Sequence, residues 1–171
     1  MTLRSFSATR AVRSAGIAGI LAVCLIATGA QAQGASPLTR LAGQWTGSGT
    51  IELANGTREP IKCRASYDVL EEQNNVQLSI RCASDSYNFD MHASATLAAK
   101  TISGIWNEVS RNVAGKISGT AEGDRFEVAA TGAAFSASLA LTTRGNKQSV
   151  VIKSKESDAT IKGATITLQR T

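Results

Sequence analysis

The sequence predicts an all-β protein, an antiparallel up-and-down barrel of about eight to ten short strands. Apolar and polar residues alternate along the chain after residue 42, and helical periodicity is nearly absent there. Turn signals such as Asn55-Gly56 and Gly145-Asn146 separate the alternating segments. A meander of such strands removes its unpaired edges by closing into a barrel. A β-sandwich is the main alternative, whereas an aromatic content of 5% disfavours a membrane barrel with aromatic girdles.

Residues 1–32 predict a secretory signal peptide. Three arginines precede the apolar run 15–30, and Ala30-Gln31-Ala32 matches the A-x-A pattern of a cleavage site. The run is too short for a comfortable transmembrane helix, so we expect no membrane insertion after cleavage. Residues 33–42 then form an N-terminal segment in which Ser36-Pro37 begins a short helical turn, and residues 43–171 form a single barrel domain. The predicted location is periplasmic or secreted.

Loss of the leader lowers the net charge of the chain. The full sequence has 18 Lys+Arg and 13 Asp+Glu, a net charge of +5, and removal of the three leader arginines leaves 15 against 13, or +2. Basic clusters with interleaved aromatic residues are missing from the sequence. Nucleic-acid binding is therefore not predicted.

The segment from Cys63 to Cys82 predicts a hairpin closed by a disulfide. Pairing Val69 with Val76 around a polar turn, residues 71–74, makes one face of the hairpin apolar and the other polar. A shift of one residue would mix the two faces. The same register sets Cys63 opposite Cys82, and opposed residues in a non-hydrogen-bonded pair lie about 4.5 Å apart at Cα, within disulfide range. Such a staple contributes on the order of 3 kcal/mol in the chain-entropy model.

Other turn signals predict the registers of the neighbouring hairpins. A three-residue loop at 55–57 sets Trp45 against Tyr67. In a separate hairpin further along the chain, Glu108 falls on the inward face opposite Phe89. In the C-terminal half, loops at 122–123, 133–134 and 145–146 give three further pairings: Gly119 with Phe126, Val128 with Leu139, and Leu139 with Ile152.

The opening of the first strand, Gly43-Gln44-Trp45 after a short turn, resembles the lipocalins and the wider calycin group. In that group the tryptophan closes one end of the barrel, and a basic residue of the last strand lies across it. Arg170 stands where that residue would be, so the resemblance implies barrel-end packing of Trp45 and Arg170. It also implies a carrier of a small apolar ligand.

A second resemblance is to the periplasmic inhibitors of bacterial metalloproteases, through Ala42-Gly43-Gln44-Trp45 and the cysteine pair. In that family the segment before the barrel enters the protease cleft, and here this segment is 33–40. It implies an alternative function, an exported barrel that binds a protein partner such as a protease. The whole chain is also similar to uncharacterised secreted proteins of alphaproteobacteria.

Inward-facing aromatic and sulfur side chains, together with one carboxylate, form the predicted ligand-binding set. Its members are Trp45, Tyr67, Tyr87, Phe89, Met91, Trp106, Glu108 and Phe126. Small residues share the inward face of the second half, so these side chains either fill a core or line a cavity. Glu108 is interpreted either as a residue at the barrel mouth or as a group that orients a ligand.

Catalytic chemistry has few candidates in this sequence. Any Ser-His-Asp or Cys-His mechanism would need His92, the single histidine, and its parity sets it on the outer face beside Asp90. No phosphate loop or metal-binding motif is present, so no cofactor and no metal are predicted. We therefore expect an exported, non-enzymatic binding protein.

Overall fold

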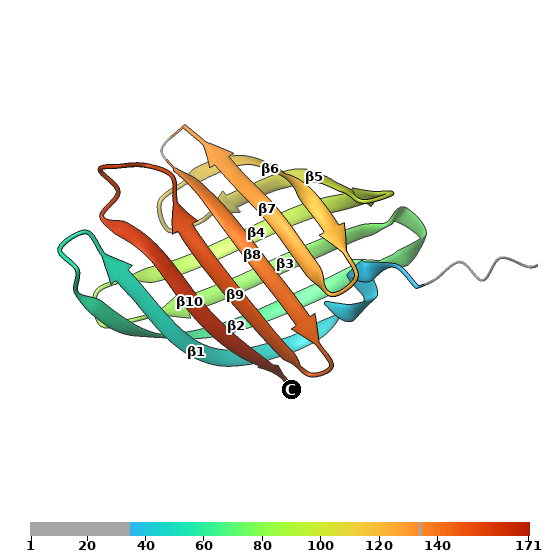
Figure 1. Ribbon diagram of the computed structural model, residues 1–171, viewed down its shortest axis with the longest axis horizontal. Coiled ribbons are helices and arrows are strands. Elements are labelled where there is room, and N and C mark those ends of the chain that lie inside the picture. Colours follow the sequence, from blue (N-terminus) through green and yellow to red (C-terminus); the bar gives the residue numbers. More distant parts are fainter. Residues whose placement is uncertain (1–34, 134) are drawn as a thin grey trace, which may run out of the picture. The chain divides into compact units, whose positions relative to one another are not determined.

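Ten antiparallel strands close into a barrel in the computed structural model, which describes residues 35–133 and 135–171 (Figure 1). Each strand pairs with the next in sequence, and the last strand pairs with the first. The predicted signal peptide, residues 1–32, lies outside the described residues. The strands are β1 (Gly43–Leu53), β2 (Arg58–Leu70), β3 (Asn75–Ala83), β4 (Asn88–Ala98), β5 (Thr101–Glu108), β6 (Val113–Glu122), β7 (Arg125–Gly132), β8 (Ser136–Arg144), β9 (Lys147–Ser154) and β10 (Ile161–Arg170).

The all-β meander barrel predicted from the alternation is confirmed. Closure comes from the pairing of β1 with β10, which runs from Trp45 opposite Arg170 to Leu53 opposite Ile161. Between residues 35 and 171, apart from position 134, no helix combines the length and apolar character needed to cross a bilayer.

The cysteine hairpin has the predicted register along its whole length. Val69 lies opposite Val76 and Cys63 opposite Cys82, and a disulfide joins the two cysteines across a Cα–Cα distance of 4.1 Å. The staple thus links the neighbouring strands β2 and β3.

The predicted register of β1 and β2 is wrong by two residues. Trp45 lies opposite Ala65, and Tyr67 lies opposite Gly43. The loop, residues 54–57, has four residues instead of the predicted three and begins one residue earlier, at Ala54, and its Gly56 takes the left-handed conformation with φ +83°.

Two more hairpins show the same two-residue displacement. The β6–β7 loop is Gly123-Asp124 instead of 122–123, so Gly119 lies opposite Val128. In the β4–β5 hairpin, Glu108 lies opposite Met91 instead of Phe89. The inward face is unchanged in every case, because side chains alternate with a period of two and a displacement of two restores the same face.

The pairings predicted for the last hairpins are confirmed. Val128 lies opposite Leu139, and Leu139 lies opposite Ile152. One apolar face therefore continues around the C-terminal half of the barrel.

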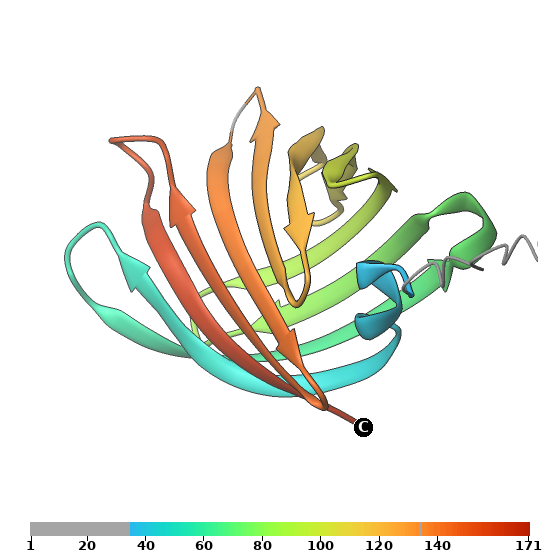
Figure 2. The same cartoon turned by 45° about the vertical axis from the view of Figure 1, so that its right-hand side comes forward.

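A short N-terminal turn closes one end of the barrel (Figure 2). It is a 3-10 helix, Pro37–Arg40, whose start is capped by the hydroxyl of Ser36. Leu38 and Leu41 are 2% and 4% exposed, so the turn presents its apolar side to the barrel interior. We call this end the closed end, and we call the opposite end, beside the β5–β6 turn and the start of β10, the mouth.

Candidate functional site

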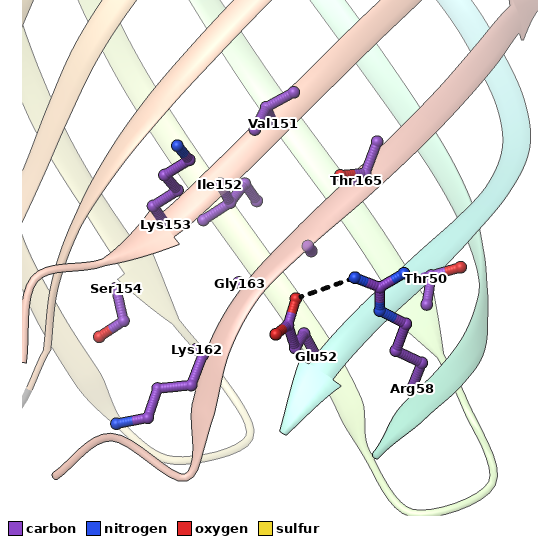
Figure 3. Close-up of a pocket in the computed structure, with 11 residues that line it drawn as sticks. Thr50, Glu52, Arg58, Val151, Ile152, Lys153, Ser154, Lys162, Gly163 and Thr165 are labelled. Carbon is purple, nitrogen blue, oxygen red and sulfur yellow. Dashed lines mark ion pairs between the residues drawn. The ribbon is translucent and has the colours of Figure 1, made fainter. Parts of the chain in front are cut away.

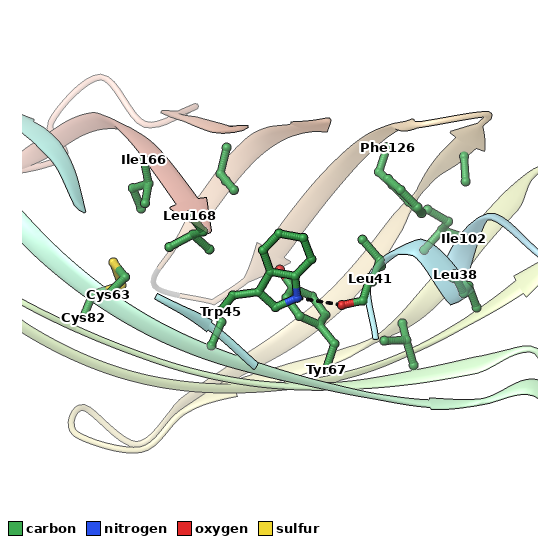
Figure 4. Packing of buried hydrophobic residues seen from close by; sticks show 14 of the residues in the cluster. Leu38, Leu41, Trp45, Cys63, Tyr67, Cys82, Ile102, Phe126, Ile166 and Leu168 are labelled. Carbon is green, nitrogen blue, oxygen red and sulfur yellow. Dashed lines mark hydrogen bonds between the residues drawn. A yellow bond between two sulfur atoms is a disulfide. The ribbon is translucent and has the colours of Figure 1, made fainter. Parts of the chain in front are cut away.

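Trp45 is the centre of the closed end. Its side chain is fully buried, and its indole Nε1 donates a hydrogen bond of 2.8 Å to the carbonyl of Leu41 (Figure 4). The guanidinium of Arg170 lies 4.4 Å from the centre of the Trp45 ring and donates to the main-chain oxygens of Arg40 and Ala42. The pair therefore joins the last strand to the N-terminal turn, which is the packing that the calycin resemblance implies.

Inside the barrel, beyond the closed end, lies an apolar cavity of about 140 Å³, the inner cavity. Its walls come from eight strands, and Leu38 and Leu41 form its floor at the closed end. Many of the side chains that face it are only half-buried, because part of their surface borders the cavity instead of packing against another side chain. This half-buried set includes Leu78, Met91, Ala93, Ala95, Val128, Leu139 and Leu141.

A second hollow of about 370 Å³, the mouth pocket, opens at the other end. Aromatic side chains line much of it, with charged groups at its edge. Its residues include Tyr87, Phe89, Glu108, Arg111, Phe135 and Glu156. Met91 and Trp106 line both the inner cavity and the mouth pocket, so the two hollows meet at these side chains.

Trp106 owes its position to glycines on the neighbouring strands. A Cβ atom added to Gly115 would lie 2.7 Å from the indole nitrogen, and one added to Gly132 would lie 3.1 Å from the indole ring. The missing side chains leave the space that the indole occupies. The ring of Phe135 packs edge-on against it, with the ring centres 5.7 Å apart. Trp106 is consequently 5% exposed, yet its Nε1 has no hydrogen-bond partner among the described residues.

Glu108 is a buried carboxylate that the main chain satisfies. One oxygen accepts from the Asp90 N–H at 3.0 Å and the other from the Arg111 N–H at 2.7 Å. Burial by itself would raise the pKa of Glu108, but the hydrogen bonds from Asp90, Arg111 and Ser110, with the charge of Arg111, hold the pKa below its usual value. The carboxylate is therefore ionised at neutral pH, and it fastens the β5–β6 turn to β4.

Arg111 lies at the edge of the mouth pocket. Its guanidinium is 3.6 Å from the Glu108 carboxylate, donates to the Asn88 carbonyl, and lies 5.1 Å from the centre of the Phe89 ring. The side chain remains 46% exposed. Arg111 is not among the predicted ligand-binding residues, and the geometry of the turn adds it to the pocket lining.

A buried polar chain lies between the inner cavity and the closed end. The Tyr67 hydroxyl donates to Gln148 Oε1 at 3.0 Å, and Gln148 Nε2 donates to the Thr143 hydroxyl at 3.1 Å. Burial raises the pKa of Tyr67 well above its ordinary value, so the phenol stays protonated. Sequence analysis missed Gln148 and Thr143, although both occupy inward positions of an alternating pattern and a polar residue there is a usable signal.

The predicted ligand-binding residues fall into three places. Tyr67 and Phe126 line the inner cavity, Tyr87, Phe89 and Glu108 line the mouth pocket, and Met91 and Trp106 line both. Trp45 lies apart from them in the closed end. The inner cavity is also lined by Leu78, Leu139 and Leu141, which were not among the predicted ligand-binding residues. Alternation predicts that a side chain faces inward, but it does not predict whether that side chain packs against another one.

The outside of the barrel also has hollows, but their linings are exposed and charged. The one over β1, β9 and β10 has a volume of about 610 Å³ and contains Arg58, Lys153 and Lys162 (Figure 3). Arg58 pairs with Glu52 at 3.7 Å while both side chains stay more than half exposed, at 73% and 52%. His92 is on the outer face with its Nε2 3.3 Å from Asp90, as its parity predicted. These surfaces lack the enclosure that distinguishes a small-molecule site.

The closed antiparallel barrel, with Trp45 and Arg170 packed across one end, resembles calycin-type barrels in its fold. No protein-family model matches the sequence, and no curated protein matches it. Solved structures do match it. One is the S-type phycobiliprotein lyase CPES from Guillardia theta, with a TM-score of 0.57 and 10% sequence identity over 78% of this chain and 90% of that chain. Another is Rv2717c from M. tuberculosis, with a TM-score of 0.64 and 11% identity over 78% of this chain and 94% of that chain.

At these identities the likeness shows the fold alone. It corrects the expectation that the chain is not an enzyme, because a protein with this barrel fold is a lyase. The absence of a recognisable catalytic motif therefore does not exclude an enzymatic activity. The similarity to secreted alphaproteobacterial proteins stays a prediction.

Proposed function

We propose that this protein binds a small, mostly apolar molecule inside its barrel. The ligand enters through the mouth pocket and places its apolar end in the inner cavity. The observation that carries the proposal is that the two hollows adjoin, with Met91 and Trp106 in the lining of both, behind a closed end sealed by Leu38, Leu41 and Trp45.

The volumes and linings support a ligand of modest size. An engineered apolar cavity of about 150 Å³ binds benzene, so the inner cavity of about 140 Å³ suits one ring or a short chain. The mouth pocket, at about 370 Å³, lies within the size range of small-molecule sites and offers aromatic walls to the rest of the ligand.

The alternative of an inhibitory N-terminal arm receives no support from the closed end. Leu38 and Leu41 are buried against the barrel, and Arg170 holds the carbonyls of Arg40 and Ala42. To enter a protease cleft, this segment would have to leave its place and expose the floor of the inner cavity.

Blocking the inner cavity tests the proposal. Ala93 lines the cavity, whereas Ala114 is exposed, so Ala93→Phe and Ala114→Phe add the same ring inside and outside the barrel. Native mass spectrometry of protein purified from its own host should reveal a bound small molecule in the unmodified chain and in Ala114→Phe. Ala93→Phe should lose that mass. Equal retention in both variants, or no bound mass in the unmodified protein, would count against the proposal.

We also propose that the protein works in an oxidising compartment outside the cytoplasm. The disulfide between Cys63 and Cys82 and the A-x-A pattern before residue 33 support this location. N-terminal sequencing of the protein from its host should find a mature chain that begins at Gln33. A chain that retains the arginines of the leader would contradict the location.

A further inference from the structure

We propose that one outer face of the barrel docks on a bilayer that contains anionic lipids and brings the mouth beside the lipid headgroups. The face extends over β9, β10, β1, β2 and β3, which are neighbours in the sheet, and it contains two open outer hollows of about 610 Å³ and about 820 Å³. We call it the basic face because its lining contains Arg58, Lys62, Arg64, Arg81, Lys153 and Lys162. The inference goes beyond the proposed function, since it assigns a partner to the outside of the barrel.

The first argument is the uneven distribution of charge. Residues 33–171 contain 15 Lys+Arg and 13 Asp+Glu. Six of these cations but only two of the carboxylates, Glu52 and Asp90, line the basic face. Nine cations and eleven carboxylates remain for the rest of the chain, so the basic face is positive and the other surfaces together are slightly negative. A field of this kind attracts an extended anionic partner and orients it toward one side of the molecule.

The second argument is that half of these cations have no counter-charge. Lys62, Arg64 and Lys153 are exposed, and none of them forms an ion pair with another described residue. Exposed cations elsewhere on the barrel do form ion pairs, at 2.5–2.6 Å, and these are Lys100, Arg125 and Arg144. The three free cations of the basic face can therefore pair with an external anion at no cost to an existing ion pair.

The third argument is the position of the basic face along the barrel. Four of its cations lie near the strand ends at the mouth, namely Arg58 at the start of β2, Arg81 toward the end of β3, Lys153 toward the end of β9 and Lys162 at the start of β10 (Figure 3). Arg64 lies opposite Arg81, and Ser110 of the β5–β6 turn lines the same hollow as both. An anionic surface that binds this face consequently lies next to the entrance of the mouth pocket.

A bilayer is the partner that best fits these three features. The basic face is open and wide, so it suits an extended surface better than an enclosed small molecule. Each Lys or Arg close to an anionic leaflet raises the affinity about fivefold. The choice of a bilayer over a soluble polyanion rests on the proposed function, because an apolar ligand dissolves in the bilayer and the mouth would then lie beside its source.

Vesicle binding tests the inference with the unmodified protein. In co-sedimentation we expect binding to vesicles of phosphatidylcholine with about one-third phosphatidylglycerol, and no binding to vesicles of phosphatidylcholine alone. Binding should disappear when the salt concentration rises from about 0.1 M to about 1 M, because the screening length falls from about 10 Å to about 3 Å. Equal binding to both kinds of vesicle, or binding to neither, would overturn the inference.

Two triple variants with the same loss of charge test the face itself. Lys62→Gln, Arg64→Gln and Lys153→Gln together should weaken binding to the anionic vesicles roughly 100-fold. The matched control combines Lys100→Gln, Lys116→Gln and Arg125→Gln, which also removes two exposed lysines and one exposed arginine but outside the basic face. The control should bind within about twofold of the unmodified protein. Equal losses in the two triple variants would mean that net charge, and not this face, drives the binding.

Nuclear magnetic resonance gives a readout of orientation that needs no variant. In bicelles that contain phosphatidylglycerol and a lipid with a nitroxide on its headgroup, the amide signals of Lys62, Arg64 and Lys153 should broaden more than those of Lys100 and Lys116. Uniform broadening, or the strongest broadening at Lys100, would contradict the proposed orientation.

Two further measurements separate this inference from the proposed function and from another class of partner. Ala93→Phe blocks the inner cavity but leaves the outer wall unchanged, so it should bind anionic vesicles like the unmodified protein. If vesicle binding fails while a small molecule still co-purifies with the protein, docking is wrong and ligand binding stands. Tighter binding to heparin than to the anionic vesicles would assign the basic face to a soluble polyanion and overturn the bilayer as its partner.

Discussion

Two sides of this barrel face the same interior but are packed differently. On β1, β2 and β10, the packed side, most inward apolar side chains are buried almost completely, from 0% exposure at Trp45 and Leu168 to 6% at Tyr67, and the half-buried ones are Leu53, Val69, Ile161 and Ala164. On β3, β4, β7 and β8, the hollow side, residues in the middle of each strand, such as Leu78, Ala93 and Leu139, are only half-buried.

The difference follows from what each side has to pack against. The N-terminal turn and Trp45 reach into the packed side and fill it, whereas the inward positions of the hollow side include several alanines that do not reach the centre. A ten-stranded barrel is also wider than an eight-stranded one. In an eight-stranded barrel the inward side chains are just large enough to fill the interior. Stability is therefore concentrated on one side and space for a ligand on the other.

The sharpest test of this contrast is a matched pair of leucine truncations. Leu168→Ala on the packed side should cost about 3–4 kcal/mol of unfolding free energy, because it leaves a new void in a close-packed region. Leu139→Ala on the hollow side should cost only about 1–2 kcal/mol, since its side chain already borders empty space. Urea unfolding measures both, and equal costs would erase the distinction between the two sides.

The disulfide links the packed side to the hollow side and gives the next effect in size. Replacing Cys63 and Cys82 together by alanine should lower the unfolding free energy by about 3 kcal/mol, because the unfolded chain regains the freedom of that loop. Neither cysteine lines the inner cavity, so the affinity for hexylbenzene, an apolar probe, should not change in the folded protein. A large loss of affinity in the folded double variant would mean that the staple shapes the cavity.

Enlarging an alanine should have opposite effects on the two sides. Ala65→Leu on the packed side should destabilise the protein by about 1–3 kcal/mol through overpacking, since Ala65 is 3% exposed. Ala95→Leu on the hollow side should be neutral or stabilise by about 0.5–1 kcal/mol, because it fills part of the inner cavity. Thermal unfolding of the two variants compares them directly, and the contrast breaks if both lower the melting temperature alike.

The smallest expected effect concerns the mouth and depends on pH. The pKa of Glu108 is lower in the folded protein than in the unfolded chain, so its carboxylate adds stability above the unfolded pKa, near pH 4.5. That contribution disappears as the pH falls through the lower, folded pKa. Glu108→Gln should therefore be less stable than the unmodified protein by about 1–2 kcal/mol at pH 7, and the gap should close in acid.

Unfolding curves at pH 7, 5 and 3 would measure this gap. Glu122→Gln is a suitable control, because Glu122 is exposed and its ion pair with Lys100 lies at the surface. A gap for Glu108→Gln that stays constant down to pH 3 would show that the carboxylate charge is not what fastens the turn.

Particular hairpins show how far the sequence could be followed. The cysteine hairpin was predictable residue by residue, since its turn is polar, its faces are unmixed and its two ends are cysteines. The β1–β2 and β6–β7 hairpins were predictable only to within two residues. The alternation accepts either register there, and the choice depends on where a glycine with positive φ enters the loop, at Gly56 and Gly123.

The candidate site was predictable to a smaller extent. Seven of the eight predicted ligand-binding residues line the inner cavity or the mouth pocket, and Trp45 lies outside both. The existence of the cavity could not be predicted, because the same inward alanines fit a narrow, filled barrel and a wider, hollow one. The role of Arg111 in the pocket depends on the fold of a turn whose spacing carries no periodic signal.

By itself, the sequence of this protein determined which side chains face inward, which cysteines can meet, and that consecutive strands pair as hairpins. These properties follow from alternation along single strands, which is a local consequence of backbone geometry. Only the tertiary structure decided that one side of the interior is packed and the other hollow, and that Trp106 stands where two hollows adjoin. The reason is that the space between opposite walls depends on the coiling and spacing of all ten strands together, which no single segment encodes.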